Sequence, residues 1–97
     1  MLTKVKIVAK LQALMPELRE HYGVEKIGLF GSFSRDEGSE NSDIDLIVTY
    51  SQRPQGWNYF SLAIYLEEVF GRKVDLTEPH CIKHQIRDNI MRQVNYI

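Results

Sequence analysis

Apolar residues recur along the chain at two spacings, one typical of helices and the other of strands. The first stretch, which Thr3 could cap and Gly23 could end, is a predicted helix with apolar residues at Val5, Val8, Leu11, Met15 and Leu18. Pro16 falls inside it, so we expect this helix to kink or split near residues 14–15. Strands are predicted over residues 24–32 and 43–50, with a short helical turn over residues 33–37 and a polar loop between them.

The second half of the chain continues this alternation. A helix is predicted over residues 57–70, then a short strand over 73–77, then a last helix over 81–97 with i+4 spacing of Ile82, Ile86, Ile90 and Val94. The order predicts an α/β protein of mixed α+β type, with a small three- to four-stranded mixed sheet flanked by helices. Strand 43–50 is apolar on both faces, so we expect it to be central in the sheet.

Length and composition narrow the classes of function. The 97 residues fit a single domain, 1–97, and the net charge of −1 provides no basic field for stable nucleic-acid binding. A lone cysteine, Cys81, excludes an intramolecular disulfide and fits a reducing compartment. The sequence shows neither a signal-peptide pattern nor a membrane-spanning apolar run, so we expect a cytoplasmic protein that does not enter a membrane.

Two aspartates open the strand over residues 43–50. Side chains two residues apart in a strand share a face, so Asp43 and Asp45 should lie side by side, with Cα atoms about 7 Å apart. Like charges at this range raise each other's pKa unless a cation lies between them. Mg²⁺ prefers oxygen ligands and often binds one or two carboxylates together with substrate phosphates. The pair therefore favours a magnesium site over the simpler interpretation of a solvated strand start.

The turn before this strand carries groups that suit a phosphate. Gly31 permits close backbone approach, and Ser32 can donate to a phosphate oxygen. Arg35 could clamp a phosphate with its forked donors, or it could pair with a neighbouring acid. Ser42 could orient Asp43 or simply belong to a turn. A metal beside a phosphate indicates phosphoryl or nucleotidyl transfer.

A third acid, Asp75, lies between Val74 and Leu76 in the short strand over residues 73–77. Its side chain should face away from the core that buries these neighbours. If this strand lies beside strand 43–50, three carboxylates share a face and could hold two metals, or one metal and a base for an incoming hydroxyl. The alternative is a surface aspartate on an edge strand.

Two segments carry a specific signature: Gly31-Ser32-Phe33-Ser34-Arg35 and Ser42-Asp43-Ile44-Asp45-Leu46-Ile47-Val48. They resemble the signature of the nucleotidyltransferase superfamily related to DNA polymerase beta, and the small size resembles its minimal (MNT) branch. The resemblance covers nearly the whole chain and implies the polymerase beta-like fold. The residues that it implicates in binding the nucleotide are Gly31, Ser32, Arg35 and Ser42. The residues that it implicates in holding two Mg²⁺ ions and in catalysis are Asp43, Asp45 and Asp75.

Minimal members of this branch resemble antitoxins that are encoded beside a HEPN ribonuclease toxin. The resemblance implies that the chain transfers AMP from ATP to a tyrosine of such a toxin and thereby silences it. A chain of this size has no extra domain to hold an acceptor. A partner protein could instead supply the acceptor itself. It could dock on residues 81–97 and on the aromatic cluster of Trp57, Tyr59 and Phe60, which we interpret as core and rim rather than as a base-stacking platform.

One position departs from the family pattern, because Asp36 stands where the family often has a glycine. A negative charge there is unfavourable for a triphosphate unless it points outward. Asp36 thus favours one alternative, a non-catalytic antitoxin that acts by binding alone. A nucleotidyltransferase for a small molecule or an RNA end also stays open, although the near-zero net charge and small size weigh against RNA. The choice of nucleotide, of Mg²⁺ or Mn²⁺ and of oligomeric state stays open as well.

Overall fold

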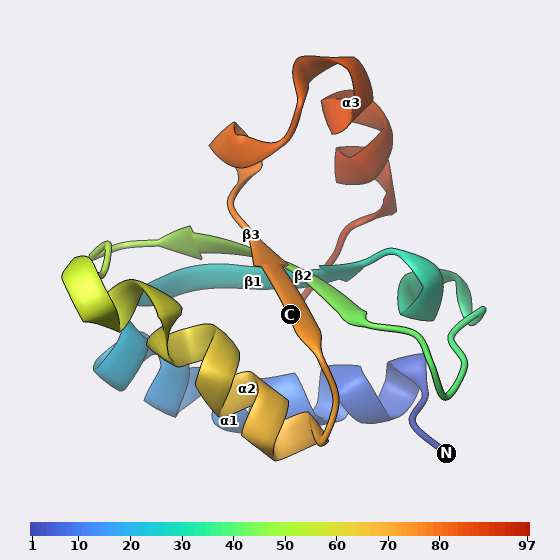
Figure 1. Ribbon diagram of the computed structural model, residues 1–97, viewed down its shortest axis with the longest axis horizontal. Helices are drawn as coiled ribbons and strands as arrows, with labels where there is room; N and C mark the ends of the chain where they lie inside the picture. Colours follow the sequence, from blue (N-terminus) through green and yellow to red (C-terminus); the bar gives the residue numbers. More distant parts are fainter.

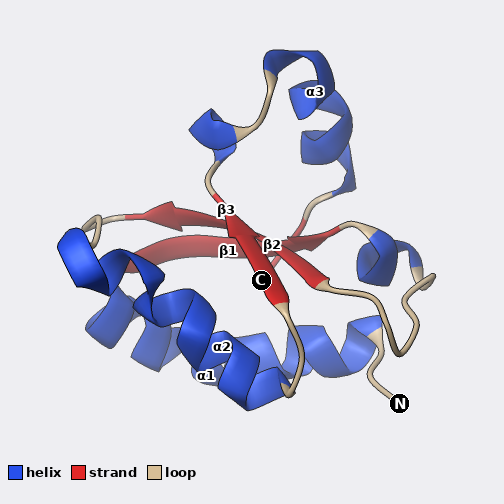
Figure 2. Ribbon diagram, viewed as in Figure 1, coloured by secondary structure: helices blue, strands red, loops and turns tan.

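The computed structural model describes residues 1–97 apart from the side chain of Trp57, so the predicted place of that ring in an aromatic cluster falls outside the described residues. A four-stranded mixed sheet forms the centre of the molecule, in the order β3-β2-β1-β4 (Figure 1, Figure 2). Its strands are β1 (Val24–Phe30), β2 (Ile44–Tyr50), β3 (Val74–Thr77) and β4 (Asn95–Tyr96). Strand β1 is antiparallel to β2 and β4, whereas β2 and β3 are parallel. The predicted mixed sheet is confirmed.

Two helices cover one face of this sheet, α1 (Lys4–Tyr22) and α2 (Ser61–Phe70) (Figure 1). Thr3 caps α1 by accepting a hydrogen bond from the Lys6 amide, and Gly23 and Gly71 end the two helices in the left-handed conformation, as expected. The main core lies between these helices and the sheet. It includes Ile7, Leu11, Met15, Leu18, Val24, Ile27, Leu29, Ile44, Leu46, Val48, Leu62, Leu66 and Val74.

Helix α1 runs through Pro16 without a break, so the prediction of a split helix is wrong. Proline removes the hydrogen bond to the carbonyl four residues earlier, which here belongs to Gln12. Both residues are exposed, so water can satisfy that carbonyl. Buried Leu11, Met15 and Leu18 fix the helix to the sheet on either side of the proline.

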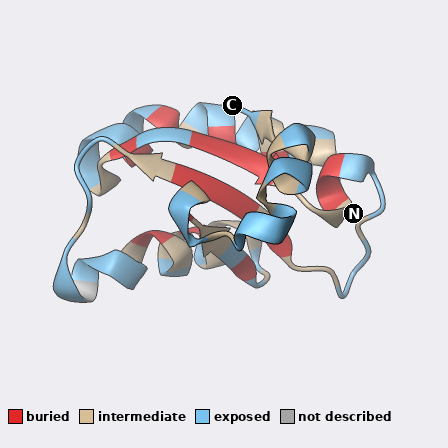
Figure 3. Cartoon of the chain, turned by 90° about the horizontal axis from the view of Figure 1, so that it is seen from above, coloured by how far each residue is buried: buried red, intermediate tan, exposed pale blue. Residues whose placement is uncertain are grey.

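The last third of the chain differs most from its prediction. The 3-10 turn η2 (Gly56–Phe60) occupies the start of the helix predicted over residues 57–70. A second 3-10 turn, η3 (Pro79–Cys81), precedes α3, which spans only His84–Gln93. The predicted continuous helix over residues 81–97 is therefore wrong, because its end forms β4. Helix α3 lies on the opposite side of the sheet from α1 and α2 and has no buried residue (Figure 1, Figure 3). Its isoleucine spacing thus does not mark a helix that packs into the core.

Strand β4 pairs with β1 beside Gly28. Gly28 is the register partner of Tyr96, and the Ile97 amide donates to the Ile27 carbonyl at 2.9 Å. A β-carbon on Gly28 would lie 2.5 Å from Val94 Cγ1 and 3.1 Å from Tyr96 Cδ1. The chain end can therefore pair with β1 at this position only because residue 28 has no side chain. No helix among the described residues combines the length and apolar character needed to cross a bilayer.

We expect Gly28→Ala to lower the free energy of unfolding by about 1–3 kcal/mol, the usual range for overpacking. Chemical denaturation measures this directly. Val94→Ala removes the nearest obstructing methyl group, so the double variant should lose less than the sum of the two single changes. Strict additivity of the two changes would contradict the proposed collision.

Candidate functional site

Parallel pairing of β2 and β3 brings two acids together. Asp45 is the register partner of Asp75, just as Ile44 is the partner of Val74. Ile44 and Val74 are buried toward the helices, so Asp45 and Asp75 face the opposite side of the sheet. Asp45 is half-buried and Asp75 is exposed. The structure therefore places Asp75 beside Asp45, as the strand pattern predicts.

Asp43 lies one residue before β2, so the strand begins one residue later than predicted. The Ile44 amide donates to the Lys73 carbonyl at 3.0 Å, which ties this segment to the start of β3. Lys73 Nζ lies 3.9 Å from Asp43 Oδ2, and both side chains are exposed. An exposed ion pair at this distance contributes little, so Lys73 competes only weakly with a cation for the carboxylate.

Asp45 carries the clearest electrostatic signal of the site. Burial raises the pKa of its carboxyl above the usual value, and the negative charges of Asp75 and Asp43 raise it further, whereas Arg35 lowers it. A divalent cation would relieve this repulsion and replace the water lost on burial. Three carboxylates of this kind are hard oxygen donors, so the residues present fit Mg²⁺.

Gly31 lies against the Asp45 carboxylate. Its φ of 74° belongs to a region that favours glycine, and a β-carbon there would overlap Asp45 Oδ2. The 3-10 turn η1 (Ser32–Arg35) follows, and Ser34 holds it by donating from its amide and its hydroxyl to the Gly31 carbonyl, at 3.1 and 2.6 Å. The turn can therefore approach the carboxylates closely, with Ser32 at its first position. Ser34 is buried and was not among the predicted site residues.

Arg35 extends from the end of η1 and uses two of its donors within the protein. Its Nε donates to Glu37 Oε2 at 3.1 Å, and its Nη1 donates to Gln93 Oε1 at 2.9 Å, at the end of α3. The pairing with a neighbouring acid is one of the two roles considered for this residue. Gln93 is 58 positions away, so no local sequence signal could have linked it to Arg35.

Ser42 belongs to the turn that leads into Asp43. Its hydroxyl accepts a hydrogen bond from the Ser39 amide at 2.9 Å and lies 3.2 Å from the Ser39 hydroxyl. Two roles were considered for Ser42, orienting Asp43 and stabilising a turn. The hydrogen bonds of its hydroxyl support the second. Its part in nucleotide binding stays a prediction.

Asp36 ends η1 with φ of 57° and ψ of 30°, the left-handed conformation. Among the described residues it is the one non-glycine with positive φ. A glycine suits such a position because it has no β-carbon to strain, which explains the family preference there. Asp36 is also exposed, so its charge faces solvent.

Another cluster brings ligand-type atoms closer together than the three aspartates do. One atom each of Glu78, His80 and Cys81 lies within 4.8 Å of the others in the part of the chain that is described. Glu78 is buried, and its Oε2 accepts from Arg53 Nη2 at 3.0 Å and from the Tyr59 hydroxyl at 3.3 Å. Since Arg53 already neutralises this carboxylate, we interpret the cluster as an internal ion pair.

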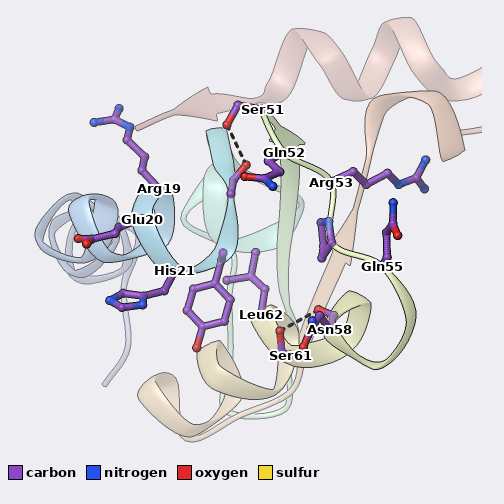
Figure 4. A pocket seen from close by; sticks show the side chains of 13 residues that line it. Arg19, Glu20, His21, Ser51, Gln52, Arg53, Gln55, Asn58, Ser61 and Leu62 are labelled. Carbon is purple, nitrogen blue, oxygen red and sulfur yellow. Dashed lines mark hydrogen bonds between the residues drawn. The ribbon is translucent and has the colours of Figure 1, made fainter.

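A hollow of about 610 Å³ lies at the other end of the sheet, between the end of α1 and the loop after β2 (Figure 4). Its lining includes His21, Ser51 and Arg53, and the Ser51 hydroxyl donates to the Gly23 carbonyl at 3.2 Å. A smaller hollow of about 110 Å³ lies beside Tyr59. The described lining of these two hollows includes none of the three aspartates. The acidic site therefore lies apart from both.

Comparison with known proteins identifies the family. The family model described as polymerase beta nucleotidyltransferase matches residues 12–97. The chain belongs to this nucleotidyltransferase family. Protein adenylyltransferase MntA of Thermococcus cleftensis is 39% identical to it over 97 residues, which cover 100% of this chain and 98% of that protein. The resemblance to the superfamily, and the transferase class that it implies, are confirmed.

Solved structures show the same fold. One, described as a minimal nucleotidyltransferase, has a TM-score of 0.79 at 24% identity and covers 97% of this chain and 95% of its own. A chain from the crystal structure of a toxin–antitoxin with AMP-PNP has a TM-score of 0.66 at 25% identity and covers 98% of this chain and 72% of its own. The polymerase beta-like fold predicted from the signature is confirmed.

We expect Asp45→Asn to make the protein more stable at pH 7, because it removes a half-buried charge and its repulsion by two neighbours. The charge of Asp45 destabilises the folded wild-type protein when the pH is above the raised pKa. This destabilisation is lost as the pH falls through that pKa toward 3.8, the usual value for the carboxyl group. Thermal unfolding of both proteins across this pH range measures the difference. A gap that stays constant down to pH 3 would contradict this origin.

We expect Asp36→Ala to lower the free energy of unfolding by about 1 kcal/mol, because alanine is strained in the left-handed conformation. Asp36→Gly removes the same carboxylate without this strain, and it should keep the wild-type stability or exceed it. Denaturation midpoints of the three proteins test this. Equal losses in both variants would instead assign the effect to the missing carboxylate.

Proposed function

We propose that this nucleotidyltransferase moves AMP from ATP to a tyrosine hydroxyl of a HEPN-type toxin and so acts as its antitoxin. The observation that carries the proposal is the sheet register that sets Asp45 beside Asp75, with Gly31 against the Asp45 carboxylate. The relative from T. cleftensis is named a protein adenylyltransferase, and the toxin–antitoxin neighbour was solved with AMP-PNP, an ATP analogue. Both support ATP as the nucleotide and a toxin as the acceptor.

Asp43, Asp45 and Asp75 are the proposed ligands of Mg²⁺. We expect two ions, because a third carboxylate lies near the pair formed by the other two. Bound there, the metal would neutralise charge on the triphosphate and on the leaving pyrophosphate. The protein contributes the donor set: the sheet register pairs Asp45 with Asp75, and the bond from the Ile44 amide to the Lys73 carbonyl ties the segment of Asp43 to the start of β3. The repulsion within that donor set favours cation binding over the metal-free form.

Gly31 and Ser32 are the proposed grip on the phosphates. The left-handed glycine brings the turn against Asp45, and the amides at the start of η1 can point to a phosphate oxygen. Arg35 lies at the end of the same turn, where its remaining donors can reach a phosphate. Ser42 is the proposed hydroxyl on the Asp43 side of the nucleotide.

The proposed reaction is a single displacement at the α-phosphorus. The tyrosine oxygen forms a bond to phosphorus while the bond to the bridging oxygen breaks, so pyrophosphate leaves and AMP stays on the tyrosine. Asp75 is exposed on β3, an edge strand of the sheet, where an acceptor hydroxyl can reach it. We assign Asp75 to orient that hydroxyl and to accept its proton.

The acceptor is proposed to dock on exposed apolar residues of α3 and of η2. Helix α3 has no buried residue, and Ile86 on it is 48% exposed, while Phe60 in η2 is 61% exposed. We propose that these exposed apolar side chains form part of the surface that the toxin contacts. We place the reaction in the cytoplasm, where ATP and the RNA cut by such a toxin are found.

We expect the purified protein with Mg²⁺ and α-labelled ATP to label the toxin encoded by the neighbouring gene. Asp43→Asn and Asp45→Asn remove charge with little change in volume, and each should lower the rate of transfer about 100-fold or more. Glu20→Gln on the exposed side of α1 is the matched control and should transfer at the wild-type rate. Label on the toxin, resolved by mass spectrometry, is the measurement.

Absence of label with ATP, GTP, CTP and UTP alike would contradict the enzymatic proposal. Protection of cells then separates catalysis from binding alone. If Asp45→Asn still binds the toxin but no longer protects cells, transfer is the antitoxin activity. Full protection by Asp45→Asn would favour the non-catalytic alternative.

A further inference from the structure

Arg72 joins two backbone carbonyls that lie about thirty positions earlier in the chain. It sits in the turn between α2 and β3, and its Nη1 donates to the Ser39 carbonyl at 2.9 Å and to the Ser42 carbonyl at 3.0 Å. These two carbonyls flank the turn that the Ser42 amide closes by donating to Ser39 at 3.1 Å. One guanidinium nitrogen therefore holds both ends of the turn that precedes Asp43.

Asp43 depends on such contacts because it lies outside the strand ladder of β2. The residue before it, Ser42, is held through its carbonyl by Arg72, and the residue after it, Ile44, is held through its amide by the Lys73 carbonyl at 3.0 Å. Two consecutive residues, 72 and 73, thus fix the backbone on both sides of Asp43. The position of this carboxylate relative to Asp45 follows from them.

The same guanidinium reaches the phosphate turn. Its central carbon lies 5.1 Å from the centre of the Phe33 ring, which is in η1 and only 2% exposed. The ring in turn fills the space beside Gly38, where a β-carbon would overlap it. Arg72 therefore contacts both irregular segments of the site, the turn after Gly31 and the loop before Asp43.

We infer that Arg72 is a positioning residue that sets Asp43 and the phosphate turn at a fixed distance from each other. The inference rests on the proposed function for its consequence, and on the contacts of Arg72 for its geometry. A planar guanidinium can donate to two carbonyls while its face covers a ring, whereas the ammonium of lysine supplies charge without this shape. Arg72 thus acts through Asp43 and Phe33.

The test compares Arg72→Lys and Arg72→Ala with the wild-type protein. In metal-free protein, hydrogen exchange of the Ser39, Ser42 and Ile44 amides should be faster in both variants. Calorimetric binding of Mg²⁺ with AMP-PNP should be weaker by about tenfold, the scale for residues that orient metal ligands. Failure of lysine to restore binding identifies a role of shape rather than of charge.

Arg53→Lys is the matched control. Like Arg72, Arg53 donates a hydrogen bond, in this case to Glu78 Oε2 at 3.0 Å, and its guanidinium lies over a ring, 5.8 Å from the centre of Tyr59. Unlike Arg72, it is in the loop after β2, at the opposite end of that strand from Asp43. This variant should leave exchange of the three amides and the binding of Mg²⁺ with AMP-PNP unchanged.

Two results would overturn the inference: wild-type exchange and binding in Arg72→Lys, or the same loosening of residues 39–44 in Arg53→Lys. The first would leave only a role of charge, and the second would show a general loss of stability. If the wild-type protein itself binds no Mg²⁺ with AMP-PNP, the proposed function fails. Hydrogen exchange then still decides whether Arg72 positions Asp43.

Discussion

The site depends on holding a half-buried carboxylate, Asp45, beside two others that repel it. What keeps it there is the hydrophobic face of the same strand, because Ile44 and Leu46 are fully buried on either side of it. A shift of one residue in the pairing of β2 would turn these two side chains to solvent and Asp45 into the core. The cost of that exchange far exceeds the repulsion among the acids. The hydrophobic core on one face of the sheet therefore fixes the position of Asp45 on the other face.

Regular pairing places only two of the proposed site residues, and the others lie in turns. Asp43 precedes β2, and Gly31 and Ser32 follow β1. Hydrogen bonds from side chains to backbone carbonyls replace the ladder in these segments, from Ser34 to Gly31 and from Arg72 to Ser39 and Ser42. Such bonds leave the neighbouring amides and carboxylates free for a ligand. The division explains how a rigid sheet can carry the turns that we propose for phosphate binding.

The sequence predicted what depends on neighbouring residues and missed what depends on distant ones. Alternation along β2 and the acid in β3 indicated a shared face, because side-chain direction follows from strand geometry alone. The i+4 pattern that Val94 continues predicts a helix at the end of the chain, and no neighbouring residue indicates that Gly28 leaves room for a strand there. Arg72 and Gln93 reach partners 30 and 58 positions away, so their roles required the structure.

The arrangement also bears on the choice between the two proposed modes of action, catalysis and binding alone. Binding a partner requires only an exposed surface, which α3 and η2 can provide without help from the sheet. Three neighbouring acids instead raise the energy of the protein without metal, since burial and mutual repulsion both oppose the charge of Asp45. A protein that acted by contact alone would gain stability from losing them. The pairing of Asp45 with Asp75 beside a left-handed glycine is therefore easier to reconcile with the proposed catalysis than with binding alone.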